Sequence, residues 1–189
     1  MSNLLLIYGT TEGHTATIAE RIATVLQAEG HAVKVVGLTE DSVGAIADYD
    51  AVIVASSIYV GQPHAKIKAF VQAHHEALRT RPTAYVQVSL STADPRPEKQ
   101  AEAQTYADRF LQEMNWAPTR VALFGGALPF TRYGVFKRLL MRYLAKKPFG
   151  LTDTARDYDF TDWAQVEAFA RAFSGDVETA QATGAVVGK

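Results

Sequence analysis

The stretch LLLIYGTTEGHTATIAERIA (residues 4–23) decides the fold. Residues 4–8 are apolar, as expected of a strand that is covered on both faces of a sheet. A loop of small and hydroxylated residues, GTTEGHT (9–15), follows, and a helical pattern begins at its end. At such a junction the unpaired N–H groups and the positive end of the helix dipole favour a negatively charged group. We therefore predict that this loop binds an anion.

The loop differs from two well-known phosphate-binding motifs. A P-loop has four residues between its glycines and a Lys-Ser/Thr pair after the second, whereas three residues separate Gly9 from Gly13 and no lysine follows. The dinucleotide motif G-x-G-x-x-G is absent as well. The hydroxyls of Thr10, Thr11 and Thr15 and several backbone N–H groups can instead surround a phosphate, with Gly13 allowing the backbone to approach closely. The alternative is an ordinary turn whose threonines cap the helix.

Short apolar runs alternate with helical patterns along the rest of the chain. Further strands are predicted at AVKVV (32–36), AVIVAS (51–56), AYVQVSL (84–90) and VALFGG (121–126). Helices are predicted from apolar residues at three-four spacing: Thr15, Ile18, Ala19, Ile22 and Leu26; Ile67, Phe70, Val71 and Leu78; Ala103, Tyr106, Phe110 and Met114; Trp163, Val166, Phe169 and Phe173. This alternation predicts an α/β fold, a five-stranded parallel sheet wound on both faces with right-handed crossovers.

Composition excludes several classes of function. The chain of 189 residues contains no cysteine, which rules out disulfides, thiolate metal sites and cysteine nucleophiles, and we predict no metal site. We also expect neither export nor a membrane span, because no apolar run reaches the ~20 residues that a span requires. The formal net charge is −1, yet residues 114–152 contain seven Lys/Arg and no Asp or Glu. That asymmetry predicts an anionic partner for one face.

We predict one domain over residues 1–174, with an insertion at about 127–160. Residues 175–189, GDVETAQATGAVVGK, are small, polar and aperiodic, which predicts a disordered tail. The sequence does not predict an oligomeric state.

The GTTEGHT loop after an apolar strand resembles the FMN-phosphate loop of the flavodoxin family. The resemblance implies the strand order 2-1-3-4-5 and an FMN cofactor at the switch point of the sheet; flavodoxin is itself the standard example of this rule. The residues implied to enclose the phosphate are Thr10, Thr11, Glu12, Gly13, His14 and Thr15. Glu12 would contribute its backbone N–H, and His14 would either donate a hydrogen bond or lie in solvent.

Two further loops are then expected beside the isoalloxazine ring, SSIYVGQPH (56–64) and SLSTADP (89–95). The implied contact residues are Ser57, Ile58, Tyr59, Val60 and Gly61 from the first loop and Ser89, Leu90, Ser91, Thr92 and Ala93 from the second. Tyr59 is the candidate for stacking on the ring, which would exclude water. The alternative is that Tyr59 is a half-buried loop residue.

The chain also resembles, over nearly its whole length, the family of menaquinone-dependent protoporphyrinogen oxidases. The shared motifs are IYVGQPH, RPEKQ, YADRFL, GGALPFTRY, TDT and FTDW. The resemblance implies FMN-dependent oxidation of protoporphyrinogen IX in haem biosynthesis, with menaquinone or another quinone as acceptor. It departs at Tyr59-Val60, where the family has Arg-Tyr, so the side chain beside the ring differs. Two other functions stay open: an electron-carrier flavodoxin and an NAD(P)H:quinone reductase, although no nicotinamide motif is found.

The segment YGVFKRLLMRYLAKK (133–147) predicts a basic amphipathic helix. Its apolar face holds Phe136, Leu139, Leu140, Tyr143 and Leu144, and its cations are Lys137, Arg138, Arg142 and Lys146. At roughly 22 Å the helix is too short to span a bilayer, but it can lie on an anionic leaflet at the inner face of the cell membrane. The alternative is an ordinary surface helix with solvated charges.

The same cations can alternatively bind the propionates of the substrate, with Arg132 and Arg138 as the candidates. His64 is a weak candidate for proton exchange near the ring, although it can equally begin a helix. We expect no nucleic-acid binding, because the aromatic residues of the basic segment lie on its apolar stripe and not on an open stacking platform.

Overall fold

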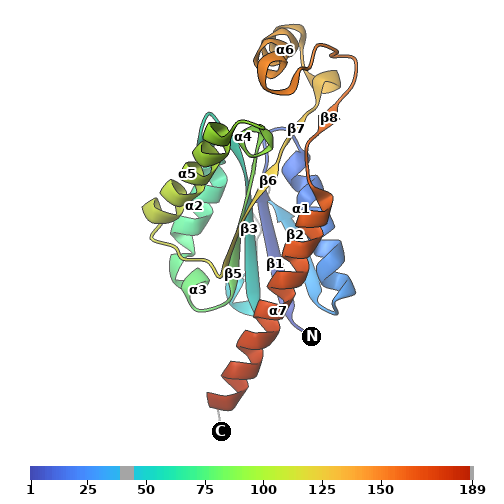
Figure 1. The fold of residues 1–189 in the computed structure, drawn as a ribbon. Helices are drawn as coiled ribbons and strands as arrows, with labels where there is room; N and C mark the ends of the chain where they lie inside the picture. Colours follow the sequence, from blue (N-terminus) through green and yellow to red (C-terminus); the bar gives the residue numbers. More distant parts are fainter. Residues whose placement is uncertain (39–44, 188–189) are drawn as a thin grey trace.

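The computed structural model describes residues 1–38 and 45–187, which form a parallel sheet with helices on both faces (Figure 1). The five parallel strands are β1 (Asn3–Gly9), β2 (Ala32–Gly37), β3 (Ala51–Tyr59), β5 (Thr83–Ser89) and β6 (Arg120–Gly125). Their order is β2-β1-β3-β5-β6, and the two-residue strand β4 (Gln62–Pro63) pairs antiparallel with the end of β3. With β4 set aside, this is the predicted order, and the predicted fold class is confirmed.

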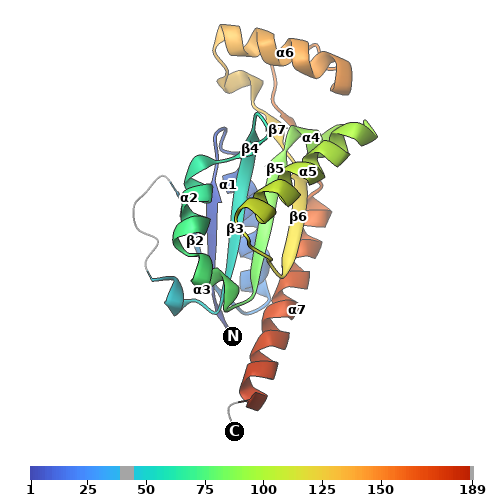
Figure 2. The same cartoon turned by 90° about the vertical axis from the view of Figure 1, so that its left-hand side faces the viewer.

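Helices α1 (His14–Ala28) and α7 (Trp163–Val187) cover one face of the sheet, and α2 (Ala65–Ala73), α3 (His75–Arg79) and α5 (Pro97–Glu113) cover the other (Figures 1 and 2). Two short helices, η1 (Ile46–Asp48) and α4 (Leu90–Ala93), lie in connections. The helix predicted from Ile67 to Leu78 is in fact two, α2 and α3, which meet at His74. None of the described helices combines the length and the apolar character that crossing a bilayer would take.

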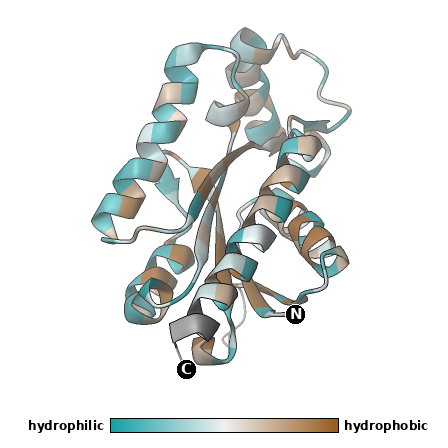
Figure 3. Cartoon of the chain, turned by 60° about the horizontal axis from the view of Figure 1, so that its bottom comes forward, coloured by the Kyte–Doolittle hydropathy of each residue, from teal (hydrophilic) through white to brown (hydrophobic). Residues whose placement is uncertain are grey.

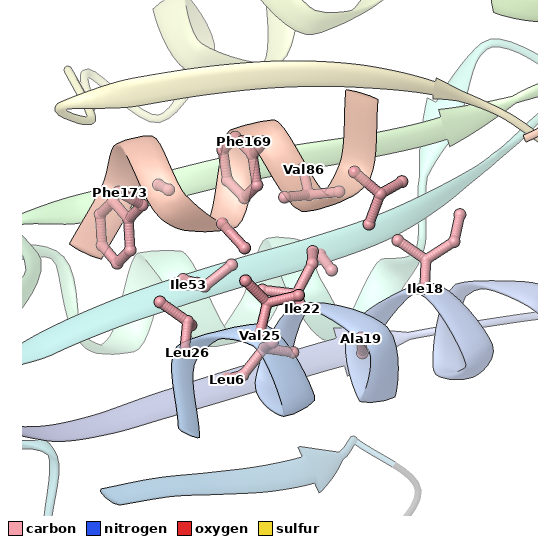
Figure 4. Packing of buried hydrophobic residues seen from close by; sticks show 14 of the residues in the cluster. Leu6, Ile18, Ala19, Ile22, Val25, Leu26, Ile53, Val86, Phe169 and Phe173 are labelled. Atoms are coloured by element: carbon pink, nitrogen blue, oxygen red, sulfur yellow. The ribbon is translucent and has the colours of Figure 1, made fainter. Parts of the chain in front are cut away.

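The core consists of two layers because successive side chains of a strand point to opposite faces of the sheet. In β1, Leu4 and Leu6 pack toward α1 and α7, whereas Leu5 and Ile7 pack toward α2 and α5. Figure 4 shows side chains of α1 and α7 facing those of the sheet in the first layer. Apolar colour is concentrated on the central strands (Figure 3).

A separate small unit follows β6 and lies over the carboxyl ends of the strands (Figures 1 and 2). It contains β7 (Ala127–Leu128), η2 (Phe130–Arg132), α6 (Val135–Phe149) and β8 (Tyr158–Asp159), and β7 pairs antiparallel with β8. We call residues 127–159 the insertion. It has its own apolar cluster, built around Leu128, Phe130, Tyr133 and Ala145. The insertion is therefore a compact addition at the edge of the sheet where the predicted loops end.

The prediction of a disordered tail is wrong for residues 175–187, which continue α7. Val177 is buried against the first core layer, and Asp176 pairs with Arg120 of β6. Beyond Val177 the described side chains, residues 178–183, are exposed. The helix projects past the lower edge of the sheet there (Figure 2), so it has no apolar periodicity for a sequence pattern to reveal. Residues 188–189 lie outside the described part of the chain.

Candidate functional site

We call the cavity at the carboxyl ends of β1, β3 and β5 the main cavity, because three of the predicted loops meet there; its volume is about 350 Å³. Of the residues predicted to contact a flavin, it is lined by Thr10, Glu12, His14, Thr15, Ser57, Ile58, Tyr59, Ser89 and Leu90. Thr11, Gly13, Val60, Gly61, Ser91, Thr92 and Ala93 were also predicted and do not line it. Its volume lies in the range of sites for small ligands, about 300–1,000 Å³.

The GTTEGHT loop presents N–H groups to this region because α1 begins at its end. Gly13 is the N-cap of α1 and has a φ of 89°, a backbone conformation that glycine adopts without strain. Its N–H donates to Thr10 Oγ1 at 2.9 Å, which closes the loop on itself. The first turn of α1 contains no acidic residue to offset the helix dipole. The N-terminus of α1 thus keeps the positive potential that the sequence predicts.

The side chains of Glu12 and His14 are held by distant segments. Lys137 Nζ of α6 donates to the Glu12 carboxylate at 2.5 Å, which ties the loop to the insertion. His14 Nε2 lies 2.6 Å from Thr161 Oγ1 and 3.3 Å from Asp159. Burial lowers the pKa of His14 below its ordinary value, and the charge of Asp159 opposes this only in part. The ring of His14 therefore faces the segment before α7, and not bulk solvent.

The loop after β3 is a tight hairpin turn. Val60 and Gly61 have φ values of 48° and 71°, the signs that a two-residue hairpin turn requires, and β4 follows at once. Tyr59 is 61% exposed on the cavity wall. Ser57 Oγ is buried and has no hydrogen-bond partner among the described residues. A buried hydroxyl without a partner at a cavity wall is available to a ligand.

The loop after β5 is held by its own hydrogen bonds. Ser89 caps α4 by accepting from the N–H of Thr92, and the two hydroxyls lie 2.9 Å apart. Ser91 lines a neighbouring cavity of about 310 Å³ instead, together with Asp94, Arg96 and Phe149. Of the polar groups predicted on this loop, Ser89 is the one that the main cavity reaches.

The roof of the cavity comes from α6 and from Tyr133, two residues before it. The sequence analysis assigned α6, Lys137 included, to the substrate or the membrane and not to the flavin. Tyr133, Phe136, Lys137, Leu140 and Met141 line the cavity opposite the loops, and Val88, Gly126 and Ala127 complete the wall. Burial, assisted by the charge of Glu12, raises the pKa of Tyr133 above its ordinary range. A signal for the roof was present: GGALPFTRY follows β6 directly, so the insertion starts at the same sheet edge as the other loops.

The predicted cations of the insertion have different surroundings. Lys137 pairs with Glu12, and the guanidinium of Arg138 donates to the carbonyl oxygens of Phe130 and Thr131. Arg132 lies beside Gly13 in a second cavity of about 210 Å³, whereas Arg142 is exposed on α6. The side chains of Leu144 and Lys147 lie outside the described part of the chain.

His64 does not line the main cavity. It is the N-cap of α2, its N–H donates to Ser56 Oγ at 2.9 Å, and its ring would lie 2.9 Å from a Cβ on Gly9. Its Nδ1 is buried without a partner among the described residues. This position favours the alternative, that His64 begins a helix.

Comparisons with known proteins decide the family. Residues 5–155 match the family described as Flavodoxin domain. The protoporphyrinogen IX dehydrogenase (quinone) of Leishmania major is 36% identical over 171 residues, which cover 90% of this chain and 74% of that protein. The protein of the same name from Escherichia coli strain K12 is 33% identical over 168 residues, which cover 88% and 92%.

The chain belongs to the flavodoxin family, among the quinone-dependent protoporphyrinogen IX dehydrogenases. Membership of this dehydrogenase family makes the chain an oxidoreductase. A flavodoxin of Streptococcus pneumonia TIGR4 superposes with a TM-score of 0.55 at 14% identity, covering 92% of this chain and 99% of that one, a likeness of fold.

The residues of the site fit the flavin that the family implies. The GTTEGHT loop offers hydroxyls and helix N–H groups to an anionic tail. Ser57 Oγ has no hydrogen-bond partner in the part of the chain that the structure describes, and the apolar side chains of Phe136 and Leu140 form a roof against which a planar ring can pack. The loops, the wall and the roof therefore suit the two ends of such a cofactor.

Proposed function

We propose that the chain binds FMN in the main cavity and oxidises protoporphyrinogen IX to protoporphyrin IX, with menaquinone as the electron acceptor. The observation that carries this proposal is the cavity between the GTTEGHT loop and α6, in a chain whose relatives are named for this reaction. The substrate loses hydrogen in three two-electron steps, and each step reduces one quinone to the quinol. When bound, FMN supplies the two-electron chemistry of each step.

The chain's own residues would bind and orient the cofactor. The hydroxyls of Thr10 and Thr15 and the first N–H groups of α1 suit the phosphate. Ser57 Oγ suits a polar atom of the ring system, and Tyr59 can cover the ring from the solvent side. Phe136, Leu140 and Met141 of α6 line the side opposite the loops and can pack on the ring. The site therefore acts by positioning the cofactor.

The test is an anaerobic assay with the full chain. We expect purified protein to be yellow and to convert protoporphyrinogen to fluorescent protoporphyrin only when a menaquinone analogue is added. Ubiquinone analogues measured in parallel would rank the acceptors. Reduction of the quinone by NADPH alone would instead favour the NAD(P)H:quinone reductase. A protein that binds FMN but turns over neither donor would favour the electron carrier.

We further propose that α6 rests on an anionic membrane surface. Apolar residues on its outer side are bare: Phe136 is 91% exposed and Tyr143 is 77% exposed. Arg142 and Lys146 are exposed on the same helix, and each can contribute about 1 kcal/mol near an anionic leaflet. Phe136 and Leu140 also line the main cavity, so a lipid-soluble quinone would enter from the bilayer side.

Vesicle binding tests this second proposal. The double variant Arg142→Glu/Lys146→Glu should lose co-sedimentation with vesicles of phosphatidylglycerol and phosphatidylcholine, because it places acids on the face that meets the lipid. Lys66→Glu, an equal change of charge per residue at an exposed position of α2, is the control and should bind normally. Equal binding by all three proteins would contradict the proposal.

A further inference from the structure

The cavity of about 310 Å³ beside the main one lies between the start of α5 and the C-terminal half of α6, and we call it the side cavity. Figure 2 shows α6 passing over the start of α5. Leu90 and Met141 line both the main cavity and the side cavity. A molecule in the side cavity is therefore one side chain away from the proposed flavin site.

The proposed reaction needs room for a second large molecule beside the flavin. At about 350 Å³, the main cavity is near the lower end of the range for one small ligand, about 300–1,000 Å³, so FMN leaves little of it for a tetrapyrrole. The cavity beside Arg132 also adjoins the main one, but the carboxylates of Glu12, Asp157 and Asp159 line it and would repel an anionic substrate. The side cavity is the better adjoining space.

One wall of the side cavity is apolar and the other is cationic. The apolar wall comes from the insertion and consists of Leu128, Met141, Ala145, Pro148 and Phe149. The opposite wall comes from the start of α5, where Arg96 and Lys99 line the cavity. Both belong to the motif RPEKQ (96–100), which the main cavity does not use. These two cations against the carboxylate of Asp94 leave the described lining with a formal charge of +1.

Asp94 orients Arg96 without using all of its donors. The side chain of Asp94 is buried and accepts from Arg96 Nε at 2.9 Å and from Nη2 at 2.6 Å. In the part of the chain that the structure describes, Nη1 of Arg96 has no hydrogen-bond partner. The pairing with Asp94 therefore fixes the plane of the guanidinium, while its remaining N–H groups stay available to a second carboxylate.

Lys99 is available to a ligand as well. Its Nζ donates to Glu102, but the side chains of Lys99 and Glu102 are 39% and 34% exposed, and ion pairs that are so exposed contribute little to stability. Glu102 also accepts from the hydroxyl of Tyr106, so it keeps a donor when Lys99 turns away. Lys99 can therefore exchange Glu102 for the carboxylate of a ligand.

We propose that the side cavity binds the tetrapyrrole substrate, with Arg96 and Lys99 binding its propionates and the apolar wall packing on its rings. Protoporphyrinogen combines an apolar body with two carboxylates, and the two walls match these two parts. A quinone has no charged group, so the cations favour the electron donor over the electron acceptor. This inference rests on the proposed function.

The test compares two porphyrins, protoporphyrin IX with free propionates and its dimethyl ester with none. The affinity of the FMN-loaded chain for each is measured by porphyrin fluorescence in the same detergent. We expect Arg96→Gln to weaken protoporphyrin binding about tenfold and Lys99→Gln about threefold, as for charge-assisted hydrogen bonds in a partly solvated site. Binding of the ester should weaken less than about twofold, because it has no carboxylate to lose.

Lys99→Gln leaves the pair of Asp94 and Arg96 intact, so it tests the inference even where Arg96→Gln lowers stability. Arg109→Gln is the matched control, because Arg109 is exposed near the other end of α5, and it should leave both affinities unchanged. In the assay, both Arg96→Gln and Lys99→Gln should raise the KM for protoporphyrinogen. The value of kcat and the KM for the menaquinone analogue should stay within about twofold.

Two results would overturn the inference while the proposed reaction stood. One is an unchanged affinity for protoporphyrin in both Arg96→Gln and Lys99→Gln, and the other is an equal weakening of protoporphyrin and its ester. If the wild type bound FMN but neither bound protoporphyrin nor oxidised protoporphyrinogen, the proposed function would fail first, and the inference with it.

Discussion

Apolar side chains are buried in the sheet, whereas several on α6 of the insertion are exposed. Ile53, Val54 and Val86 in the sheet are 0% exposed, and helices cover them on both faces. In the insertion, one side of α6 packs on a small cluster through Ala145, whereas Phe136 on the other side is 91% exposed. Apolar residues in the sheet therefore stabilise the chain itself. Those on the outer side of α6 contribute little to folding, which leaves them available to something outside the chain.

The largest expected effect separates these two kinds of apolar residue directly. Phe173→Ala removes a fully buried ring from the layer under α7 and should lower the free energy of unfolding by about 3–5 kcal/mol. Phe136→Ala should change it by less than about 0.5 kcal/mol. Urea denaturation of both variants measures the difference. A large loss in Phe136→Ala would mean that α6 is packed by the chain after all.

The junction between the two regions is the next test. A Cβ on Gly125 would lie 2.3 Å from the carbonyl oxygen of Phe160, where the chain leaves the sheet and returns to it. Gly125→Ala should therefore cost about 1–3 kcal/mol and loosen the insertion. Thermal unfolding gives the first quantity, and limited proteolysis within residues 127–159 reports the second. Unchanged proteolysis would show that the insertion tolerates a shift of this strand end.

Val60 is another exposed apolar residue. Because of its backbone conformation, we expect a substitution there to raise the free energy of unfolding and not to lower it. A β-branched residue at a φ of 48° is strained, whereas asparagine accepts this conformation, and Asn-Gly is the favoured pair for such a turn. Val60→Asn should raise the free energy of unfolding by about 1 kcal/mol. Val121→Asn, also at an exposed apolar position but in β6, is the control and should bring no gain. A loss of stability in Val60→Asn would show that Val60 packs on a neighbour.

The smallest effect concerns Asp94 and depends on pH. Arg96 donates hydrogen bonds to this carboxylate and holds the pKa of Asp94 below its ordinary value. A depressed pKa in the folded state adds stability above the unfolded pKa, near 4, and that stability is lost as the pH falls through the folded value. Asp94→Asn should therefore be less stable than the wild type at pH 7, with the difference shrinking below pH 4. A difference that did not change with pH would contradict this account.

The sequence predicted the sheet well because its strands are local and apolar. β1, β2 and β6 begin and end within one residue of the predicted bounds, and α6 (Val135–Phe149) lies two residues beyond the predicted helix. The hairpin after β3 was missed because Val60 carries no turn signal. The end of α7 was missed because the residues that project past the sheet are exposed. They therefore show no apolar periodicity that would indicate a helix.

About half of the residues that line the candidate site were predicted from the sequence. Loops at the carboxyl ends of parallel strands share one edge whatever the rest of the chain does, so Thr10, Ser57 and Ser89 could be brought together from the sequence. The residues of α6 that form the roof could not be predicted in this way. An apolar stripe such as that of Phe136 and Leu140 does not indicate which part of the chain the helix will face.

The sequence by itself determined the order of strands and helices, the position of the GTTEGHT loop at the start of α1 and the basic, amphipathic character of α6. Only the tertiary structure decided that Lys137 meets Glu12, that Arg132 meets Gly13 and that Phe136 stays bare. The reason is that periodicity and propensity act over a few residues, whereas these contacts join segments more than 100 residues apart. Such pairs depend on where the whole insertion sits, and its position is set by the packing at Gly125 and at the insertion's own cluster.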